Sequence, residues 1–189
     1  MHILNVHSAH IVKLKVSEAP TNLLNMNDQT TNLLGVVGLA VADRIEESAR
    51  EILKHVGETP AALVVIGYDL GPTNDQLRTV LGLSHSGTVR LVDRLVKDGL
   101  VVRRQGSSKR EIALYPTKKG KLLREQILAE RLNSIRPLLD PLTNQERETL
   151  DQLLHKVLAS METTDMERRT LCRLCDNRVC ENCPIPADF

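Results

Sequence analysis

The chain has 189 residues, no Trp, two Tyr, one Phe and a formal net charge of +1. This length suits one ordinary domain with an appendage, whose core must come from Leu, Val, Ile and Ala. No apolar run approaches the ~18 residues that a membrane-spanning helix needs, and the N-terminus lacks the pattern of a secretory signal. We therefore expect a cytoplasmic protein with no membrane partner.

The N-terminal third of the chain predicts an arm followed by one long helix. Residues 1–29 show little organisation, whereas residues 31–56 form an apolar-rich helical pattern. From Leu33 to Ala42 this pattern is apolar on nearly every side. A helix that is hydrophobic all round must be buried all round, which in so short a chain predicts burial against a second subunit.

Three short helices are predicted next, each by its capping residues. Thr59 precedes a proline and is expected to cap a helix that ends near residue 71. Thr73 and Gln76 have the spacing of a capping box, which opens a helix that Gly82 ends. Ser84 is the predicted cap of the third helix, which runs to Gly99. Its inward residues are expected to be Thr88, Leu91, Val92 and Leu95.

A β-hairpin and further helices complete the expected order. The β-prone runs 100–104 and 111–115 flank the polar turn 105–110, which predicts a hairpin with a basic tip. Thr117 then caps a long helix that is interrupted near Pro137 and Pro141. Thr143 and Glu146 form a second capping box, and the helix that it opens is expected to run to about Arg168.

This order predicts a mainly α (α+β) fold, in which a helix-turn-helix is followed by a β-hairpin wing. Between residues 72 and 124 there are twelve Lys and Arg but only four Asp and Glu, a net charge of +8, whereas the rest of the chain sums to −7. A basic block of this kind indicates a polyanion partner, here double-stranded DNA. The candidate DNA-binding residues are Ser84, His85, Ser86, Arg90, Arg94, Lys97, Lys109 and Arg110.

The candidates on the second helix of the helix-turn-helix, which Ser84 caps, have different expected roles according to their position along it. His85, Ser86 and Arg90 lie where base contacts in the major groove are expected, and Arg90 could read guanine. Arg94 and Lys97 lie further along and suit phosphate contacts. Lys109 and Arg110, at the hairpin tip, suit the minor groove.

Residues 31–167 resemble the MarR family of winged-helix regulators. The resemblance rests on the segment Leu83 to Val101 and on the following wing, where Arg110, Thr117 and Gly120 match the family signature. Ser108 and Pro116 stand where that signature has Asp and Leu. The resemblance implies a homodimer held by its N- and C-terminal helices, and a small-molecule or redox effector.

All four cysteines lie in the pattern C-x2-C-x4-C-x2-C, formed by Cys172, Cys175, Cys180 and Cys183. Four thiolates suit tetrahedral zinc, our first expectation, or an iron–sulfur cluster. Free or disulfide-forming thiols are the third alternative.

These observations divide the chain into an arm (1–29), a MarR-like domain (30–168) and a cysteine-rich tail (169–189). Within the domain, the DNA-binding lobe is expected at about 58–122 and the dimerisation helices at about 31–56 and 117–168. We predict a homodimeric, sequence-specific transcriptional repressor with a C-terminal metal or redox module. No nucleophile–base pair or Gly-rich phosphate loop predicts an enzyme. The alternative function is a redox or electron-transfer protein that uses a C-terminal iron–sulfur cluster.

Overall fold

The computed structural model describes residues 26–53, 57–68, 70–106, 108, 111–161, 163–179 and 183–185. It is mostly helical with one two-stranded antiparallel sheet, which confirms the predicted fold class. The elements are α1 (Met26–Ile52), α2 (Thr59–Ile66), α3 (Asn74–Leu81), α4 (His85–Lys97), β1 (Val101–Gln105), β2 (Ile112–Pro116), α5 (Lys118–Ile135), the 3-10 helix η1 (Arg136–Leu139), α6 (Asn144–Ala159) and α7 (Asp165–Leu171).

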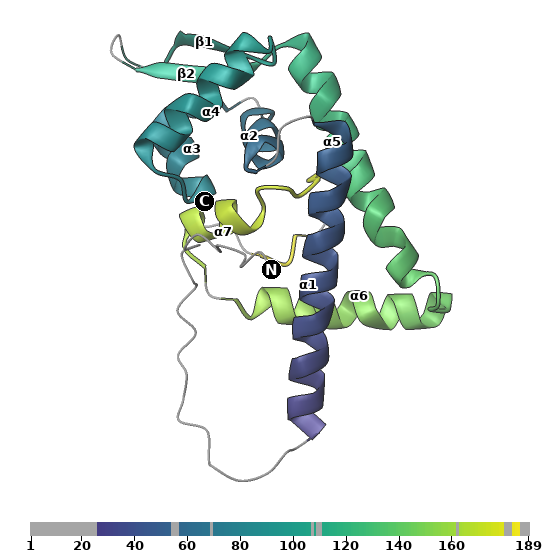
Figure 1. The fold of residues 1–189 in the computed structure, drawn as a ribbon. Coiled ribbons are helices and arrows are strands. Elements are labelled where there is room, and N and C mark those ends of the chain that lie inside the picture. The colour runs from purple at the N-terminus through teal and green to yellow at the C-terminus, as the bar shows by residue number, and fades with distance from the viewer. Residues whose placement is uncertain are drawn as a thin grey trace, which may run out of the picture.

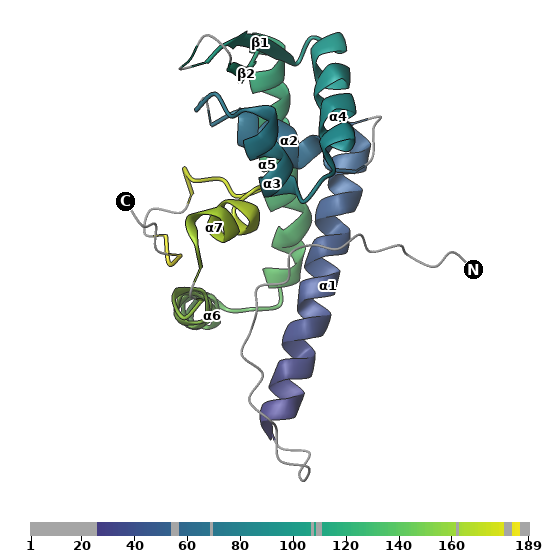
Figure 2. The ribbon, with the colours of Figure 1, turned by 90° about the vertical axis from the view of Figure 1, so that its left-hand side faces the viewer.

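The elements form a lobe and a stem. In Figure 1 the lobe, made of α2, α3, α4 and the hairpin, lies at the top, and α1 runs down from it beside α5. Helix α6 crosses near the lower end of the stem, while α7 lies under α3 (Figures 1 and 2). No helix among the described residues is both long and apolar enough to cross a membrane.

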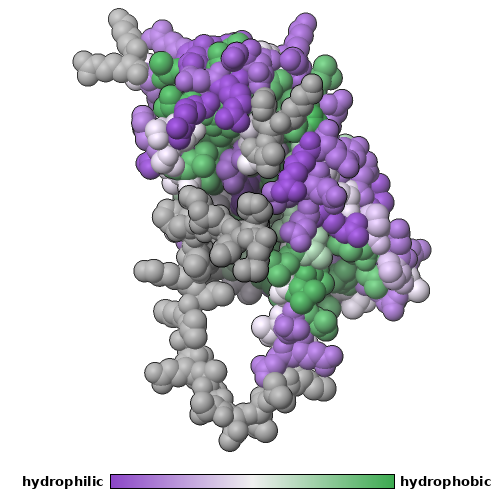
Figure 3. Space-filling view, in the orientation of Figure 1, coloured by the Kyte–Doolittle hydropathy of each residue, from purple (hydrophilic) through white to green (hydrophobic). Residues whose placement is uncertain are grey.

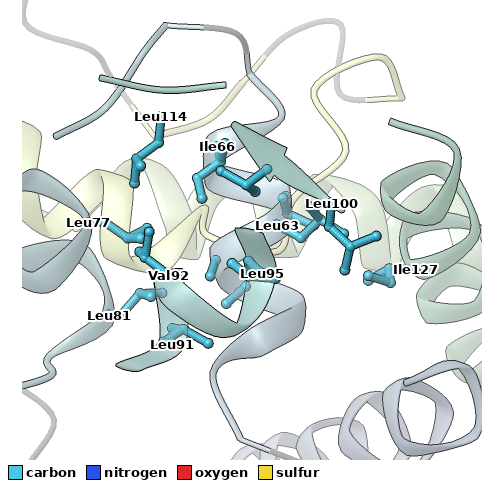
Figure 4. Close-up of a cluster of buried hydrophobic side chains, with 14 of the residues drawn as sticks. Leu63, Ile66, Leu77, Leu81, Leu91, Val92, Leu95, Leu100, Leu114 and Ile127 are labelled. Carbon is cyan, nitrogen blue, oxygen red and sulfur yellow. The ribbon is translucent and has the colours of Figure 1, made fainter. Parts of the chain in front are cut away.

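The core lies inside the lobe and is built by the apolar faces predicted from the sequence. Leu63 and Ile66 of α2 meet Leu77 of α3 and Leu95 of α4, all fully buried (Figure 4). The four inward residues expected on α4 are buried, which confirms its register: Thr88, Leu91, Val92 and Leu95.

Local capping fixes the turn between α3 and α4. The Thr73 hydroxyl accepts from the Gln76 amide at 3.2 Å, and the Gln76 side chain accepts from the Thr73 amide at 2.9 Å, so the predicted capping box is present. Gly82 ends α3 in the left-handed region at φ +64°, which glycine adopts without a Cβ penalty. Ser84 caps α4, since its hydroxyl accepts from the Gly87 amide at 3.1 Å.

Several predicted helix boundaries need correction. Helix α2 ends at Ile66, not near residue 71, and the Gly67 amide closes it by donating to the Leu63 carbonyl at 2.9 Å. Helix α1 begins at Met26, before residue 31, with Asp28 favourably placed in its first turn. Helix α2 is capped at Glu58, not Thr59, because the Glu58 carbonyl already accepts the first helical bond from the Ala62 amide at 2.8 Å.

The last predicted helix also needs correction, because it is two helices. Helix α6 ends at Ala159 and α7 starts anew at Asp165. A further capping box, formed by Thr164 and Glu167, opens α7. The segment therefore turns after α6 and brings α7 back to the lobe.

Candidate nucleic-acid interface and cysteine segment

Helix α4 has one buried apolar face and one exposed polar face. The Ser84 cap fixes where the helix begins, and the core fixes its rotation, so the remaining positions point to solvent. The predicted DNA-binding residues in this part are all exposed and lie on this one element or its cap: Ser84, His85, Ser86, Arg90, Arg94 and Lys97. The arrangement offers cations, hydroxyls and an imidazole to a polyanion.

The first turn of α4 is linked to α3 by polar contacts. His85 Nδ1 lies 4.0 Å from Asp75 Oδ1, and Asp75 is also 3.5 Å from Arg78 Nε. The Ser84 and Ser86 hydroxyls are 3.4 Å apart. Because the Ser84 oxygen caps the helix, its contribution to the interface is mainly the orientation of α4.

The hairpin is attached to α4 by an ion pair that the sequence reasoning missed. In the sheet, Val101 pairs with Pro116 and Gln105 with Ile112. Arg103 of β1 donates to Asp93 of α4 at 2.6 Å. This contact holds the wing against the helix expected to enter the groove. The predicted wing-tip residues, Lys109 and Arg110, lie outside the described residues.

The foot of the wing is fixed by Thr117 and Gly120, two positions of the family wing signature. The Thr117 amide donates to the Leu100 carbonyl at 2.9 Å, and its hydroxyl donates to the Gly99 carbonyl at 2.7 Å. The same hydroxyl accepts from the Gly120 amide at 3.0 Å, which caps α5. Their role in this structure is therefore to join β1 to α5.

Three of the four cysteines, Cys172, Cys175 and Cys183, line one cavity with residues of the lobe. Cys172 ends α7, and the Cys175 amide donates to the Cys172 carbonyl at 2.8 Å, so the two share one turn. Both are partly buried, whereas Cys183 is exposed, and all three line a cavity of about 400 Å³. Cys180 lies outside the described residues. Within the described part of the chain, no three His, Cys, Asp or Glu side chains are arranged to hold a metal ion.

Tyr68, at the end of α2, anchors the cysteine turn. Its hydroxyl donates to the Cys175 carbonyl at 2.7 Å and lies 3.4 Å from the Cys172 carbonyl. Burial, together with the nearby cysteines, raises the pKa of Tyr68. Leu174 and Met166 pack against the core of the lobe. The described turn at 172–175 is thus packed onto the lobe, although the sequence suggested an appendage.

Helices α3 and α4, the Gly82 turn and the β1–β2 hairpin define a winged helix-turn-helix protein. The MarR family model matches residues 60–111. Over these residues the chain is therefore similar to the MarR family, in agreement with the sequence resemblance.

Known proteins similar to this chain are transcriptional regulators by name. The transcriptional repressor MprA of Escherichia coli K12 is 27% identical over 93 residues, which are 49% of this chain and 53% of MprA. The chain thus spans about half the length of that relative. The HTH-type regulator YybA of Bacillus subtilis is 27% identical over 101 residues, which are 53% of this chain and 67% of YybA.

Solved structures share the fold over most of their length. Apo MarR from E. coli is 25% identical with a TM-score of 0.57, over 72% of this chain and 99% of MarR. The YusO protein of B. subtilis is 17% identical with a TM-score of 0.60, over 72% of this chain and 99% of YusO. The latter similarity concerns the fold alone.

Proposed function

We propose that this chain is a sequence-specific DNA-binding transcriptional regulator, a cytoplasmic homodimeric repressor and not an enzyme. The observation that carries the proposal is α4, whose buried face fixes its rotation while its other face exposes Arg90, Arg94 and Lys97. A wing stands beside it, within the block of net charge +8. The similarity to the repressor MprA supports repression and not activation as the mode of regulation.

In this function α4 enters the major groove. His85, Ser86 and Arg90, in its N-terminal half, contact base edges, because the N-terminal residues of such helices read sequence. Arg94 and Lys97 neutralise phosphates further along. Lys109 and Arg110 of the wing reach the minor groove, where a narrow, negative groove attracts arginine.

The first experiment selects bound duplexes from a random pool and measures their affinity by fluorescence anisotropy. Arg90→Ala should weaken binding to the preferred duplex by about 1–3 kcal/mol per half-site and relax the sequence preference of the protein. Arg136→Ala, on the exposed η1 of the stem, is the matched control and should bind like the parent.

The wing is tested by its salt dependence. Lys109→Ala combined with Arg110→Ala should weaken binding to every duplex and reduce the slope of log K against log salt by up to about two. Parent-like binding by this variant and by Arg90→Ala at all salt concentrations would refute the groove assignment.

Dimerisation is proposed through exposed apolar faces of α1 and α6. No residue of α6 is buried in the single chain. Figure 3 shows an apolar patch over parts of α1 and α6, more extended than isolated surface leucines would give. A second copy is the proposed occupant, since a helix apolar all round needs a partner on each face. The residues are Leu33, Leu34, Val36, Val37, Leu39, Leu153, Leu154 and Val157.

Sedimentation tests the dimer. The parent should be dimeric at micromolar concentration, and Leu39→Glu with Leu153→Glu should shift it to monomer. Ile112→Glu, an equally apolar and exposed position on the wing, is the control and should stay dimeric. A monomeric parent would contradict the proposal.

We also propose that Cys172, Cys175, Cys180 and Cys183 hold one zinc ion. The shared turn of Cys172 and Cys175, and the cavity that these two line with Cys183, support it. Zinc would hold the segment together through four thiolates. An iron–sulfur cluster is the alternative that the same ligands allow.

Metal analysis of anaerobically purified protein decides between these metals, because only the cluster gives visible absorption. Replacing all four cysteines by serine should remove the metal and leave helicity and dimerisation nearly intact. Since thiolates compete with protons for the metal, it should also be released as pH falls. A quadruple variant that keeps stoichiometric metal would refute the site.

A further inference from the structure

We propose that Asp75 of α3 determines which base His85 reads, because it allows His85 to bind DNA as the charged imidazolium and to contact guanine. This inference rests on the proposed function, in which α4 enters the major groove, and deepens it by naming one base that is read. Asp75 is not among the residues proposed to contact DNA. It acts through His85 and is therefore a positioning residue.

Asp75 and His85 lie on the two helices of the helix-turn-helix. Helices α3 and α4 pack against each other (Figure 1), and the Ser84 cap places His85 at the first position of α4. The imidazole Nδ1 of His85 lies 4.0 Å from the Asp75 Oδ1. This separation suits an ion pair but is too long for a hydrogen bond, so the charge of Asp75 couples the two side chains. Both side chains are exposed, at 75% and 77%, and are therefore open to DNA.

Opposing charges surround the His85 imidazole. The N-terminal end of α4 carries partial positive charge, and Arg78 of α3 lies with its Nε 3.5 Å from the same Asp75 oxygen. Both disfavour a second cation at this place, whereas Asp75 favours one. Helix α4 has no acidic residue in its first turn, and Arg103 of β1, which also packs against α4, is paired with Asp93. Within the described part of the chain, Asp75 is therefore the one carboxylate in ion-pair reach of His85.

DNA binding shifts this balance toward the charged form of His85. Backbone phosphates bring negative charge to the surface of α4, and the exclusion of water strengthens each nearby charge interaction. Histidine side chains change their charge between about pH 5 and 8, so we expect His85 to take up a proton when the phosphates and Asp75 together favour the cation. Without Asp75, the positive charges of Arg78 and of the helix end are unopposed within the protein, and His85 is expected to bind DNA neutral.

The charge on His85 decides which base edge it can bind. A neutral imidazole has one donor and one acceptor nitrogen, whereas an imidazolium has two donors. In the major groove, guanine alone presents two acceptors, N7 and O6, while cytosine and adenine present amino donors. With Nδ1 on the Asp75 side, the Nε2–H of the imidazolium is left to donate to guanine. Arg90 lies five positions further along α4, about 7.5 Å at 1.5 Å per residue, so it reads a different base pair.

The first measurement is the base preference of the full-length protein. Duplexes are selected from a random pool at about pH 6.5 with the parent, His85→Gln and Asp75→Asn. The base pair whose preference changes in His85→Gln is the one that His85 reads. Asp75→Asn should lose about tenfold of the preference for guanine there, the equivalent of one hydrogen bond to a charged group. It should also bind unrelated duplexes more tightly, because a negative charge near DNA is removed, so specificity and general affinity change in opposite directions.

The second measurement counts the protons that are taken up on binding. Calorimetric titration with the selected duplex, in buffers of different ionisation enthalpy, should show uptake of up to about one proton per protomer, and affinity should fall as pH rises from about 6 to 8. His85→Gln and Asp75→Asn should each lose most of this uptake. Asp151→Asn is the matched control, because Asp151 lies 3.8 Å from the Nε2 of His155 on α6, away from the lobe (Figure 1). This variant should keep the proton uptake and the base preference of the parent.

The outcomes separate this inference from the proposed function. A parent that binds its preferred duplex without proton uptake overturns the inference and leaves the regulator standing. An Asp75→Asn protein that keeps the guanine preference and the uptake of the parent overturns the role of Asp75. A parental preference for adenine or cytosine at the position that His85 reads overturns the assigned base. A parent that selects no duplex from the pool overturns the proposed function and, with it, the inference.

Discussion

Gly120→Ala should loosen the foot of the wing. Gly120 lies in the first turn of α5, and a Cβ on it would stand 2.1 Å from the Leu100 carbonyl oxygen, which is backbone and cannot rotate away. Carbon–oxygen contacts normally lie at about 3.3–3.6 Å, so the first turn of α5 must move by more than about 1 Å. That exceeds the spread of about 0.5 Å in hydrogen-bond distances, so the bonds at this contact would be lost.

The expected magnitude follows from the bonds at that contact. Thr117 donates to the Leu100 carbonyl from its amide at 2.9 Å and to the Gly99 carbonyl from its hydroxyl at 2.7 Å. At about 1 kcal/mol each, the loss of these two bonds costs roughly 2 kcal/mol. Helix propensity returns up to about 1 kcal/mol, which leaves a net loss of about 1 kcal/mol.

Thermal unfolding followed by circular dichroism measures this loss. For a chain of this size, about 1 kcal/mol should lower the Tm by roughly 2–4 °C. Lys118→Ala, an exposed change in the same helical turn, is the control and should change stability by less than about 0.5 kcal/mol. The variant should also bind DNA more weakly, because the wing is displaced. A Tm equal to that of the parent would show that the close approach of Gly120 to Leu100 is not a constraint.

Three further predictions concern the lobe and its neighbours. Leu63→Ala empties a fully buried site and should destabilise the protein by about 2–5 kcal/mol in urea unfolding, with the m-value unchanged; a smaller loss would mean that the core collapses to fill the cavity. Burial raises the pKa of Glu58. The stability that its protonated form contributes is therefore present below the unfolded-state pKa and is lost as pH rises through the folded-state pKa. Glu58→Gln should be more stable than the parent at pH 7 and show a flatter pH dependence of stability in acid, measured by thermal melts at a series of pH values. Asp93→Asn breaks the 2.6 Å ion pair with Arg103 that holds the wing against α4. Loss of wing positioning predicts DNA binding several-fold weaker by anisotropy. Tighter binding would mean that removal of the negative charge decides the affinity instead.

The lobe could be predicted from sequence because its signals are local. The Thr73 box, the Gly82 turn and the Ser84 cap each act within four residues, and the structure shows all three. The inward face of α4 followed from its 3.6-residue period alone. What positions the candidate DNA-binding residues of α4 is thus encoded next to them in the chain.

The break between α6 and α7 has a local signal in the sequence. Thr164 and Glu167 have the same capping-box spacing as the boxes at Thr73 and Thr143. The apolar spacing of α6 predicts a longer helix, but the structure follows the capping box. Capping signals should therefore outweigh a periodic pattern when the two disagree.

The docking of the cysteine segment could not be predicted in this way. Tyr68 and Cys175 are separated by 107 positions in the chain, and no local pattern states that they meet. Likewise, Arg103 meets Asp93 only because the hairpin folds back over α4. Such contacts depend on tertiary packing, which a single sequence does not reveal.

The capping of α6 has a consequence for how the protein assembles. This helix buries no residue in the single chain, yet Thr143 and Glu146 cap its start, and Arg147 donates to the Leu139 and Leu142 carbonyls at 3.2 Å each. Its order is therefore specified before any partner covers it. Most of the conformational entropy of α6 is therefore lost when a single chain folds. A second copy binds a surface that is already ordered, so association does not require coupled folding of this helix.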